Sequence, residues 1–158
     1  MLDKKERGIT LIEMLVVIII IGILASLALP GFGRTKEHVV GKEAQANLKL
    51  IAAAEKIYRM ESEDQAYVDC VCSCSGTDCS TNTCNNATGT TKGCNYLLKL
   101  SLNPKNWTYS VTDASTSAFT AVADRTDTAA SPYNECIYTL TSDDTDGEPD
   151  PNDTTKCP

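Results

Sequence analysis

One apolar stretch near the N-terminus constrains the fold of this chain more than any other feature. Residues 9–29 read ITLIEMLVVIIIIGILASLAL, and Glu13 is the only charged residue among them, with sixteen consecutive uncharged residues after it. At about 1.5 Å per residue, a helix of this length spans roughly 30 Å, which is the thickness of a bilayer core. The stretch therefore predicts a helix that crosses a membrane.

The segments around this stretch are arranged differently from those of an ordinary secretory signal. Such a signal has a basic start, a shorter apolar stretch and a small-residue cleavage site after that stretch. Here a short polar leader, MLDKKERG, precedes the apolar stretch, and no A-x-A-like site follows it. Pro30, Gly31 and a charged helical pattern come next. The order is thus reversed relative to a secretory signal.

A second helical pattern covers residues 34–60. Apolar residues recur there at intervals of three or four, which predicts an amphipathic helix, and its many charged residues are interpreted as a solvated face. Glu55 and Arg59 form a candidate i,i+4 ion pair. We expect one long helix, kinked or locally loosened near Pro30. The apolar stripe comprises Val40, Ala44, Leu48, Ile51 and Tyr58, extended by Leu50, Ala53 and Ile57.

All eight cysteines lie beyond residue 69, which favours a disulfide framework and an oxidising compartment. Six of them fall in residues 70–94, a stretch rich in Ser, Thr, Asn and Gly without a helical or strand period, so we expect a covalently linked loop. A thiolate metal site is the alternative, but two CxxC pairs are lacking and His38 is far away. Six cysteines allow fifteen pairings, which stay open. The six are Cys70, Cys72, Cys74, Cys79, Cys84 and Cys94.

Short alternating runs after this loop predict an antiparallel sheet. Residues 107–111, 119–123 and 136–140 are the three candidate strands, with 97–102 as an optional fourth. Their apolar face would pack on the helical stripe. The expected fold class is α+β: a long N-terminal helix, membrane-spanning in its first half and amphipathic in its second, packed on a small sheet, with the Cys-rich loop between them.

Charge and composition argue against several functions. Residues 60–158 carry five Lys/Arg against fifteen Asp/Glu, so this acidic head would repel phosphates, and no specific nucleic-acid site is visible. With one histidine and no phosphate-cradling Gly loop, no catalytic set can be assembled, and we expect no enzyme. No cofactor is expected, with one exception: Asp144, Asp146 and Gly147 partly imitate a calcium loop but lack the later Glu of an EF-hand. A solvated turn is the preferred interpretation.

The residues GITLIEMLVVIIIIGILASLALPGF resemble the N-terminus of type IV pilins and pseudopilins. In that family a short basic leader ends in Gly, prepilin peptidase cuts after the Gly, and the new N-terminus is methylated. The resemblance implies cleavage between Gly8 and Ile9, with Glu13 and Pro30 as the fifth and twenty-second residues of the mature chain. Ile9 departs from the Phe or Met that the family usually has after the cut.

The same resemblance implies a role for Glu13. A carboxylate inside a membrane segment is costly unless it is paired, so such residues are functional by default. In the family the acid pairs with the N-terminal amine of a neighbouring subunit, which here would be that of Ile9, while Pro30 belongs to the same assembly segment. The alternative is an incidental acid that snorkels to the headgroups. The resemblance also implies a disulfide between Cys136 and Cys157 that closes a C-terminal loop.

The resemblance implies a structural subunit that polymerises through its N-terminal helix into an extracellular pilus-like filament for adhesion or motility. Its partners would be other pilin subunits, a prepilin peptidase and an assembly platform in the inner membrane, where the subunit would stay, head outside, until assembly. Two alternatives remain: a pseudopilin of type II secretion, and a membrane-tethered Cys-rich binding module that never polymerises. The expected organisation is 1–8 leader, 9–33 assembly helix, 34–60 amphipathic helix and 61–158 head, with a variable loop at 61–95 and the sheet with its C-terminal loop at 96–158.

Overall fold

A computed structural model describes residues 9–28, 32–75, 81–89, 91–126, 133–144 and 147–157. The chain divides into two compact units, Met1–Lys36 and Glu37–Pro158. The first unit contains helix α1 and the beginning of helix α2, and the second contains the rest of α2 and all of the β-structure.

Helix α1 covers Leu11–Ala28. Thr10 stands just before it and serves as its N-cap, since the Glu13 amide donates to both the carbonyl and the hydroxyl oxygen of Thr10, at 3.1 and 3.3 Å. The residues of α1 are apolar on all sides of the helix, so the helix has no polar face and is not amphipathic. Within the residues that the structure describes, no helix is both long and apolar enough to cross a membrane.

Helix α2 covers Phe32–Glu61, close to the predicted range of 34–60. The expected kink near Pro30 falls in residues 29–31, outside the described residues. Part of the predicted apolar stripe is wrong: Leu50 and Ile57 are 47% and 53% exposed and Ala53 is exposed too, although the sequence places all three with the core. They lie on a flank of α2 that is rotated away from the sheet, which covers only one side of the helix. The buried stripe is Val40, Ala44, Leu48, Ile51 and Ala54.

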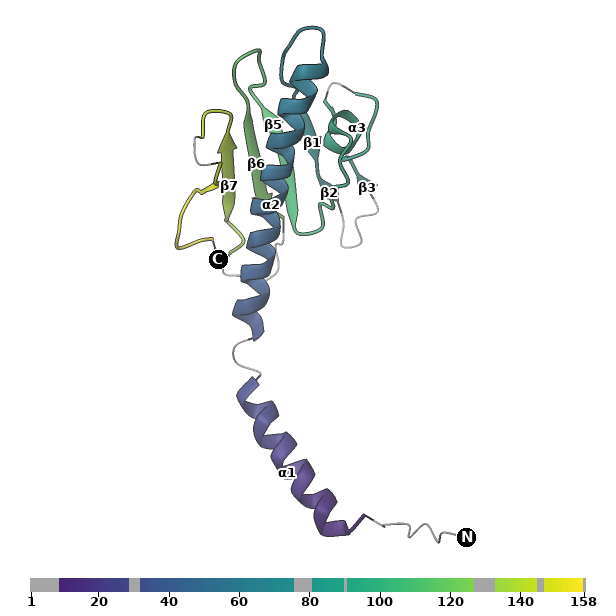
Figure 1. Cartoon of the computed structure of the whole chain (residues 1–158), viewed down its shortest axis with the longest axis vertical. Coiled ribbons are helices and arrows are strands. Elements are labelled where there is room, and N and C mark those ends of the chain that lie inside the picture. Colours follow the sequence, from purple (N-terminus) through teal and green to yellow (C-terminus); the bar gives the residue numbers. More distant parts are fainter. Residues whose placement is uncertain are drawn as a thin grey trace, which may run out of the picture. The chain divides into compact units, whose positions relative to one another are not determined.

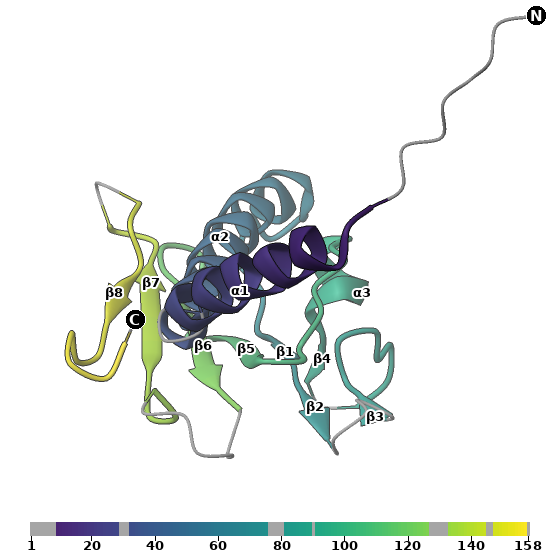
Figure 2. The same ribbon diagram turned by 90° about the horizontal axis from the view of Figure 1, so that it is seen from below.

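The main sheet has six strands in the order β4-β1-β5-β6-β7-β8, and α2 lies across one of its faces (Figures 1 and 2). All neighbouring strands are antiparallel except the pair β1 and β4. The strands are β1 Cys70–Cys72, β4 Lys92–Gly93, β5 Trp107–Thr112, β6 Thr120–Arg125, β7 Ile137–Thr141 and β8 Asp150–Pro151. The predicted α+β class and the three central strands are therefore confirmed.

The Cys-rich segment differs from its prediction as an irregular loop. It contributes β1 and β4 to the main sheet, and β2 Cys74–Ser75 pairs with β3 Thr81–Asn82 in a separate small sheet. These strands have two or three residues each, too short for a visible alternation in sequence. The optional strand at 97–102 is wrong: its first residues belong to the short helix α3, Cys94–Leu98, which a left-handed Lys99 terminates.

The core lies between α2 and the sheet, and aromatic side chains of β5 and β7 fill much of it. Trp107 and Tyr138 are buried with their ring centroids 5.6 Å apart. The indole nitrogen of Trp107 donates to the Val40 carbonyl at 3.0 Å, and the Asn47 amide donates to the Tyr109 hydroxyl at 2.8 Å. These two bonds fix the distance and rotation of α2 relative to β5, because each polar group would otherwise be buried without a partner.

A buried ion pair joins α2 to β6. The Arg125 guanidinium donates to Glu37 Oε2 at 3.1 Å and lies over the Trp107 ring, 5.3 Å from its centroid. The Arg125 side chain is only 2% exposed. Ring stacking and a carboxylate partner together compensate for removing this charge from water.

Candidate assembly segment and disulfide framework

The predicted assembly residues lie only partly within the described residues. Ile9 is exposed directly before α1, and Glu13 lies in the first turn of α1 with its side chain exposed. A negative charge at this position is stabilised by the positive end of the helix dipole. Gly8 and Pro30 lie outside the described residues. Cleavage after Gly8, methylation of Ile9 and the pairing of Glu13 therefore stay predictions.

Large apolar side chains occur on all sides of α1. From Leu11 to Leu24 they are about half exposed or more in the single chain, and Glu13 is the only charged residue of the helix. A helix that is apolar all round is stable only when lipid or protein covers it. The chain thus carries a segment that needs a surrounding apolar phase or further copies of itself.

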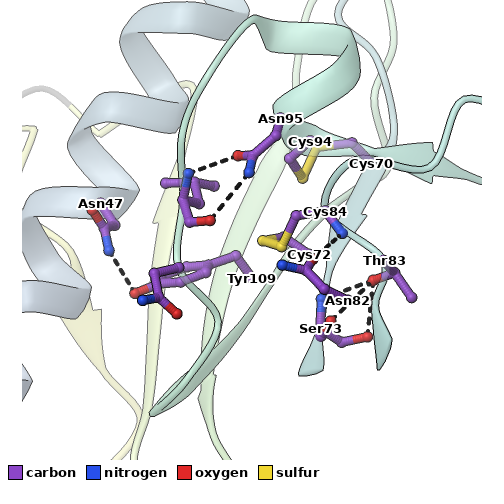
Figure 3. Close-up of a disulfide and its surroundings, with 12 residues drawn as sticks. Asn47, Cys70, Cys72, Ser73, Asn82, Thr83, Cys84, Cys94, Asn95 and Tyr109 are labelled. Atoms are coloured by element: carbon purple, nitrogen blue, oxygen red, sulfur yellow. Dashed lines mark hydrogen bonds between the residues drawn. A yellow bond between two sulfur atoms is a disulfide. The ribbon is translucent and has the colours of Figure 1, made fainter. Parts of the chain in front are cut away.

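Two disulfides anchor the Cys-rich segment to the sheet. Cys70 is joined to Cys94 and Cys72 to Cys84, and all four residues are buried (Figure 3). Cys70 and Cys72 alternate along β1, so their side chains emerge on the same face of the strand. The alternative of a thiolate metal site is wrong for these residues, because a sulfur in a disulfide does not offer a thiolate ligand.

Two further loop cysteines complete the set. Cys74 is also disulfide-bonded. Cys79 lies outside the described residues.

Polar side chains support the two disulfides, and sequence reasoning missed them. The Asn95 side chain satisfies both backbone groups of Leu102, accepting from its amide at 2.7 Å and donating to its carbonyl at 3.1 Å. The Asn82 side chain accepts from the Cys84 amide at 2.7 Å (Figure 3). Gly93 is packed so closely that a Cβ atom there would lie 2.1 Å from the Cys84 carbonyl oxygen. The backbone of β4 therefore depends on a residue without a side chain.

A further disulfide joins Cys136, just before β7, to Cys157. This is the pairing that the family resemblance implies. The intervening segment is held by Asn152, whose side chain accepts from the Ile137 amide at 2.9 Å and donates to the Glu135 carbonyl at 3.2 Å. Hydrogen bonds from Thr155 lower the pKa of Asp153, so this exposed carboxylate stays charged in the C-terminal loop.

The acidic segment before β8 uses its described side chains for local contacts. Asp144 Oδ2 accepts from the Thr141 amide at 2.6 Å, and Glu148 forms an ion pair with Lys49 of α2. Asp146 lies outside the described residues. No cluster of three ligating side chains occurs within the part of the chain that the structure describes. Calcium at Asp144 and Asp146 thus stays a prediction from sequence.

Glu55 is buried in the head, whereas the sequence places it in an ion pair with Arg59. Its Oε2 accepts from the Val68 amide at 3.0 Å, while its other oxygen is buried without a hydrogen bond. Arg59 instead donates to the Gln65 carbonyl at 3.0 Å. Burial raises the pKa of Glu55 to about 7, with a smaller contribution from the nearby Asp69 carboxylate. Together these contacts fasten the segment that leads from α2 into β1.

Comparison with known proteins bears on the N-terminal part of the chain. Residues 3–29 match the prokaryotic N-terminal methylation motif. The type IV major pilin protein PilA of Myxococcus xanthus is 41% identical over 61 residues, which are 39% of this chain and 28% of that protein. Type II secretion system core protein G of Escherichia coli is 38% identical over 58 residues, 37% of this chain and 40% of that protein.

A third relative, competence protein ComGC of Streptococcus pneumoniae, is 36% identical over 62 residues, 39% of this chain and 57% of that protein. The chain therefore spans well under two thirds of the length of these relatives. No solved structure matches the chain.

The motif and the relatives together define the class: over its matched part, this chain is similar to type IV pilins and pseudopilins, as the sequence predicts. Within that class the similarity extends to a major pilin, a secretion core protein and a competence protein alike. The matches cover 37–39% of this chain.

Proposed function

We propose that this chain is a structural subunit that polymerises through its N-terminal helix into an extracellular type IV pilus-like filament for adhesion or motility. The methylation motif over residues 3–29 is the observation that supports this proposal most. The all-round apolar surface of α1 adds to it, because packing α1 helices of many subunits together would cover that surface.

In this proposal, cleavage of the leader creates the charged group that assembly needs. A prepilin peptidase cuts after Gly8 and creates a free amine on Ile9, which pairs with Glu13 of the next subunit. The pair forms among apolar side chains, where losing one partner leaves a buried charge that costs about 3–5 kcal/mol. Before assembly, the N-terminal segment holds the subunit in the inner membrane with its head outside, and an assembly platform there adds it to the filament.

Intact mass spectrometry of filaments sheared from the native cell surface tests the proposal. The expected dominant species begins at an N-methylated Ile9 and gains eight hydrogens on reduction, since the sequence has eight cysteines. Filaments without this chain, in cells whose membranes hold it uncut from Met1, would contradict the proposal. That result would favour a membrane-tethered binding module.

A second candidate function is that of a pseudopilin in type II secretion. The observation in its favour is the similarity to type II secretion system core protein G, found in Escherichia coli and again in Klebsiella pneumoniae at 34% identity over 59 residues. Deleting the gene distinguishes the two: a pseudopilin mutant loses secreted proteins from the medium and keeps its surface filaments, whereas a pilin mutant loses the filaments.

A further inference from the structure

A groove of about 880 Å³ lies between α2 and α3 in the head. Its floor is apolar and open to solvent: Leu50, Ile57 and Tyr96 are 47%, 53% and 43% exposed. Leu50 and Ile57 line the groove from α2 and Tyr96 lines it from α3, so the three exposed apolar side chains gather in one place. A concave apolar surface of this kind usually marks an interaction site.

One end of this groove carries negative charge. Glu61, Glu63 and Asp64 line it and are exposed, at the point where α2 ends. Lys99 is the one cation among the lining residues, and it is turned onto its own segment, donating to the Tyr96 carbonyl at 3.2 Å. We call this surface the acidic groove: apolar along its length, with carboxylates at one end.

The next side of α2 has the opposite character. Lys56, Arg59 and Met60 line a hollow of about 650 Å³ together with residues that lead away from the helix. Met60 is 77% exposed and Lys56 is exposed, while Arg59 is engaged with the Gln65 carbonyl and the Tyr67 hydroxyl. We call this surface the basic flank. At about 100° per residue, it occupies a different side of the helix from Leu50 and Ile57, at the same height as the carboxylates.

We infer that the acidic groove of one copy receives the basic flank of a second copy. Met60 of the second copy lies on the apolar floor formed by Leu50 and Ile57, and its Lys56 faces the carboxylates at the end of the groove. The occupant is assigned by charge complementarity: the surface that matches the groove is found on the same chain. The inference rests on the proposed function, since it assumes that copies of this chain assemble with one another.

The geometry fits a chain of copies better than a closed pair. Groove and flank are different surfaces, so each copy keeps one of each free after the first contact. Such a heterologous contact continues into an open helical array unless its rotation closes a ring. Charges at the edge of an interface fix its register and exclude wrong partners more than they add to its affinity. The sign of these charges should therefore matter more than how many there are.

Charge reversal in the full chain tests the inference. Lys56→Glu alone, and Glu63→Lys with Asp64→Lys, should each lower the amount of sheared filament several-fold, because like charges then face each other. The triple variant, with all three reversals, should recover most of it. Lys42→Glu is the matched control: it makes the same charge change on an exposed part of α2 outside both surfaces, and should leave filaments unchanged.

A zero-length carbodiimide cross-linker joins an amine to a carboxylate with loss of water. It detects the contact directly in wild-type filaments, without a variant that assembles poorly. Wild-type filaments should yield a covalent dimer containing a Lys56 peptide linked to the 61–64 peptide. Lys56→Arg keeps the charge but removes the reactive amine, so its filaments should form normally and lose that dimer.

The outcomes separate the two proposals. Wild-type filaments that contain this chain, yet show neither the charge-reversal rescue nor the Lys56 cross-link, would overturn the inference and leave the proposed function standing. Filaments without this chain in wild-type cells would overturn both. An unchanged dimer in Lys56→Arg would show that other amines carry the contact, which also overturns the inference.

Discussion

The carboxyl group of Glu55 lies between α2 and the segment that leads into β1. Val68 donates its amide to one oxygen, and Asp69 is the neighbouring acid that raises the pKa further. The pKa is about 7 in the folded head against 4.5 as the ordinary value, so the folded chain holds this proton more tightly than the unfolded chain. Linkage then makes stability greatest below pH 4.5 and lowers it as the pH rises toward 7.

We expect the head to lose up to about 3 kcal/mol of stability between pH 4.5 and 8 through this group alone. Glu55→Gln removes the titration, so the variant should be the more stable chain at pH 8 and should gain little at pH 4.5. Unfolding of the full chain in detergent, followed by circular dichroism at several pH values, measures this. Parallel pH profiles of the two chains would rule out Glu55 as the cause.

Gly93 provides a second test at the scale of a residue. Because its Cβ would lie 2.1 Å from the Cys84 carbonyl oxygen, Gly93→Ala forces the backbone of β4 away from the loop. We expect a loss of about 1–3 kcal/mol in unfolding free energy, measured with denaturant. Gly33→Ala is the control, since nothing lies within 4 Å of the added atom. Equal effects of the two substitutions would contradict the close packing.

Among the secondary-structure elements, β1 depends most on covalent links. It has three residues, and two of them enter disulfides that close separations of 24 and 12 residues. Loops of these lengths correspond to about 3 kcal/mol each in the chain-entropy estimate. A strand of only three residues therefore owes its place in the sheet to cross-links more than to its own pairing.

Removing Cys70 and Cys94 together, as the double substitution to Ala, should cost about 3 kcal/mol or more and leave no unpaired thiol behind. The same double change at Cys136 and Cys157 should cost a similar amount but act at the other end of the sheet. Hydrogen exchange separates the two: the first variant should lose protection in β1 and α3, and the second in β7 and β8. Identical exchange patterns would argue against two separate anchors.

The sequence predicts the long elements well and the short ones poorly. α2 and the strands β5 to β7 carry enough residues for their apolar spacing to be recognised. The elements β1, β4, β8 and α3 do not, because two to five residues contain too little pattern. The run at 97–102 has strand composition, but its first two residues belong to α3 and the rest form an irregular segment, in which Asn95 occupies the backbone groups of Leu102.

The candidate site also has parts that the sequence predicts and parts that it does not. Its N-terminal motif is a contiguous stretch and could be recognised from sequence alone, as the family match over residues 3–29 confirms. The acidic groove and the basic flank could not, because Leu50 and Ile57 look like core residues until the sheet is seen to cover only one side of α2. Glu55 and Arg59 have ideal spacing for an ion pair, and only the packing of residues 65–68 shows that each serves a different contact.

At the scale of the whole molecule, the proposed function separates two properties of the chain, which are its residence in the membrane and its assembly into a filament. Glu13→Leu makes the N-terminal segment more apolar and removes the acid that the proposal pairs with Ile9 of the next subunit. We expect this variant to remain in the membrane fraction with its disulfides formed, while filaments fall at least about tenfold, since losing a buried partner exceeds 1.4 kcal/mol. Immunoblots of sheared and membrane fractions measure both; normal filament yield would exclude the pairing.

The two outer strands of the main sheet limit how heads could pair with one another in the proposed filament. β4 and β8 contribute only two residues each, and Pro151 in β8 has no amide hydrogen to donate. In the proposed filament, neighbouring heads would therefore offer one another little exposed backbone for extending their sheets. Contacts between heads in the proposed filament would then be made by side chains and not by shared backbone hydrogen bonds.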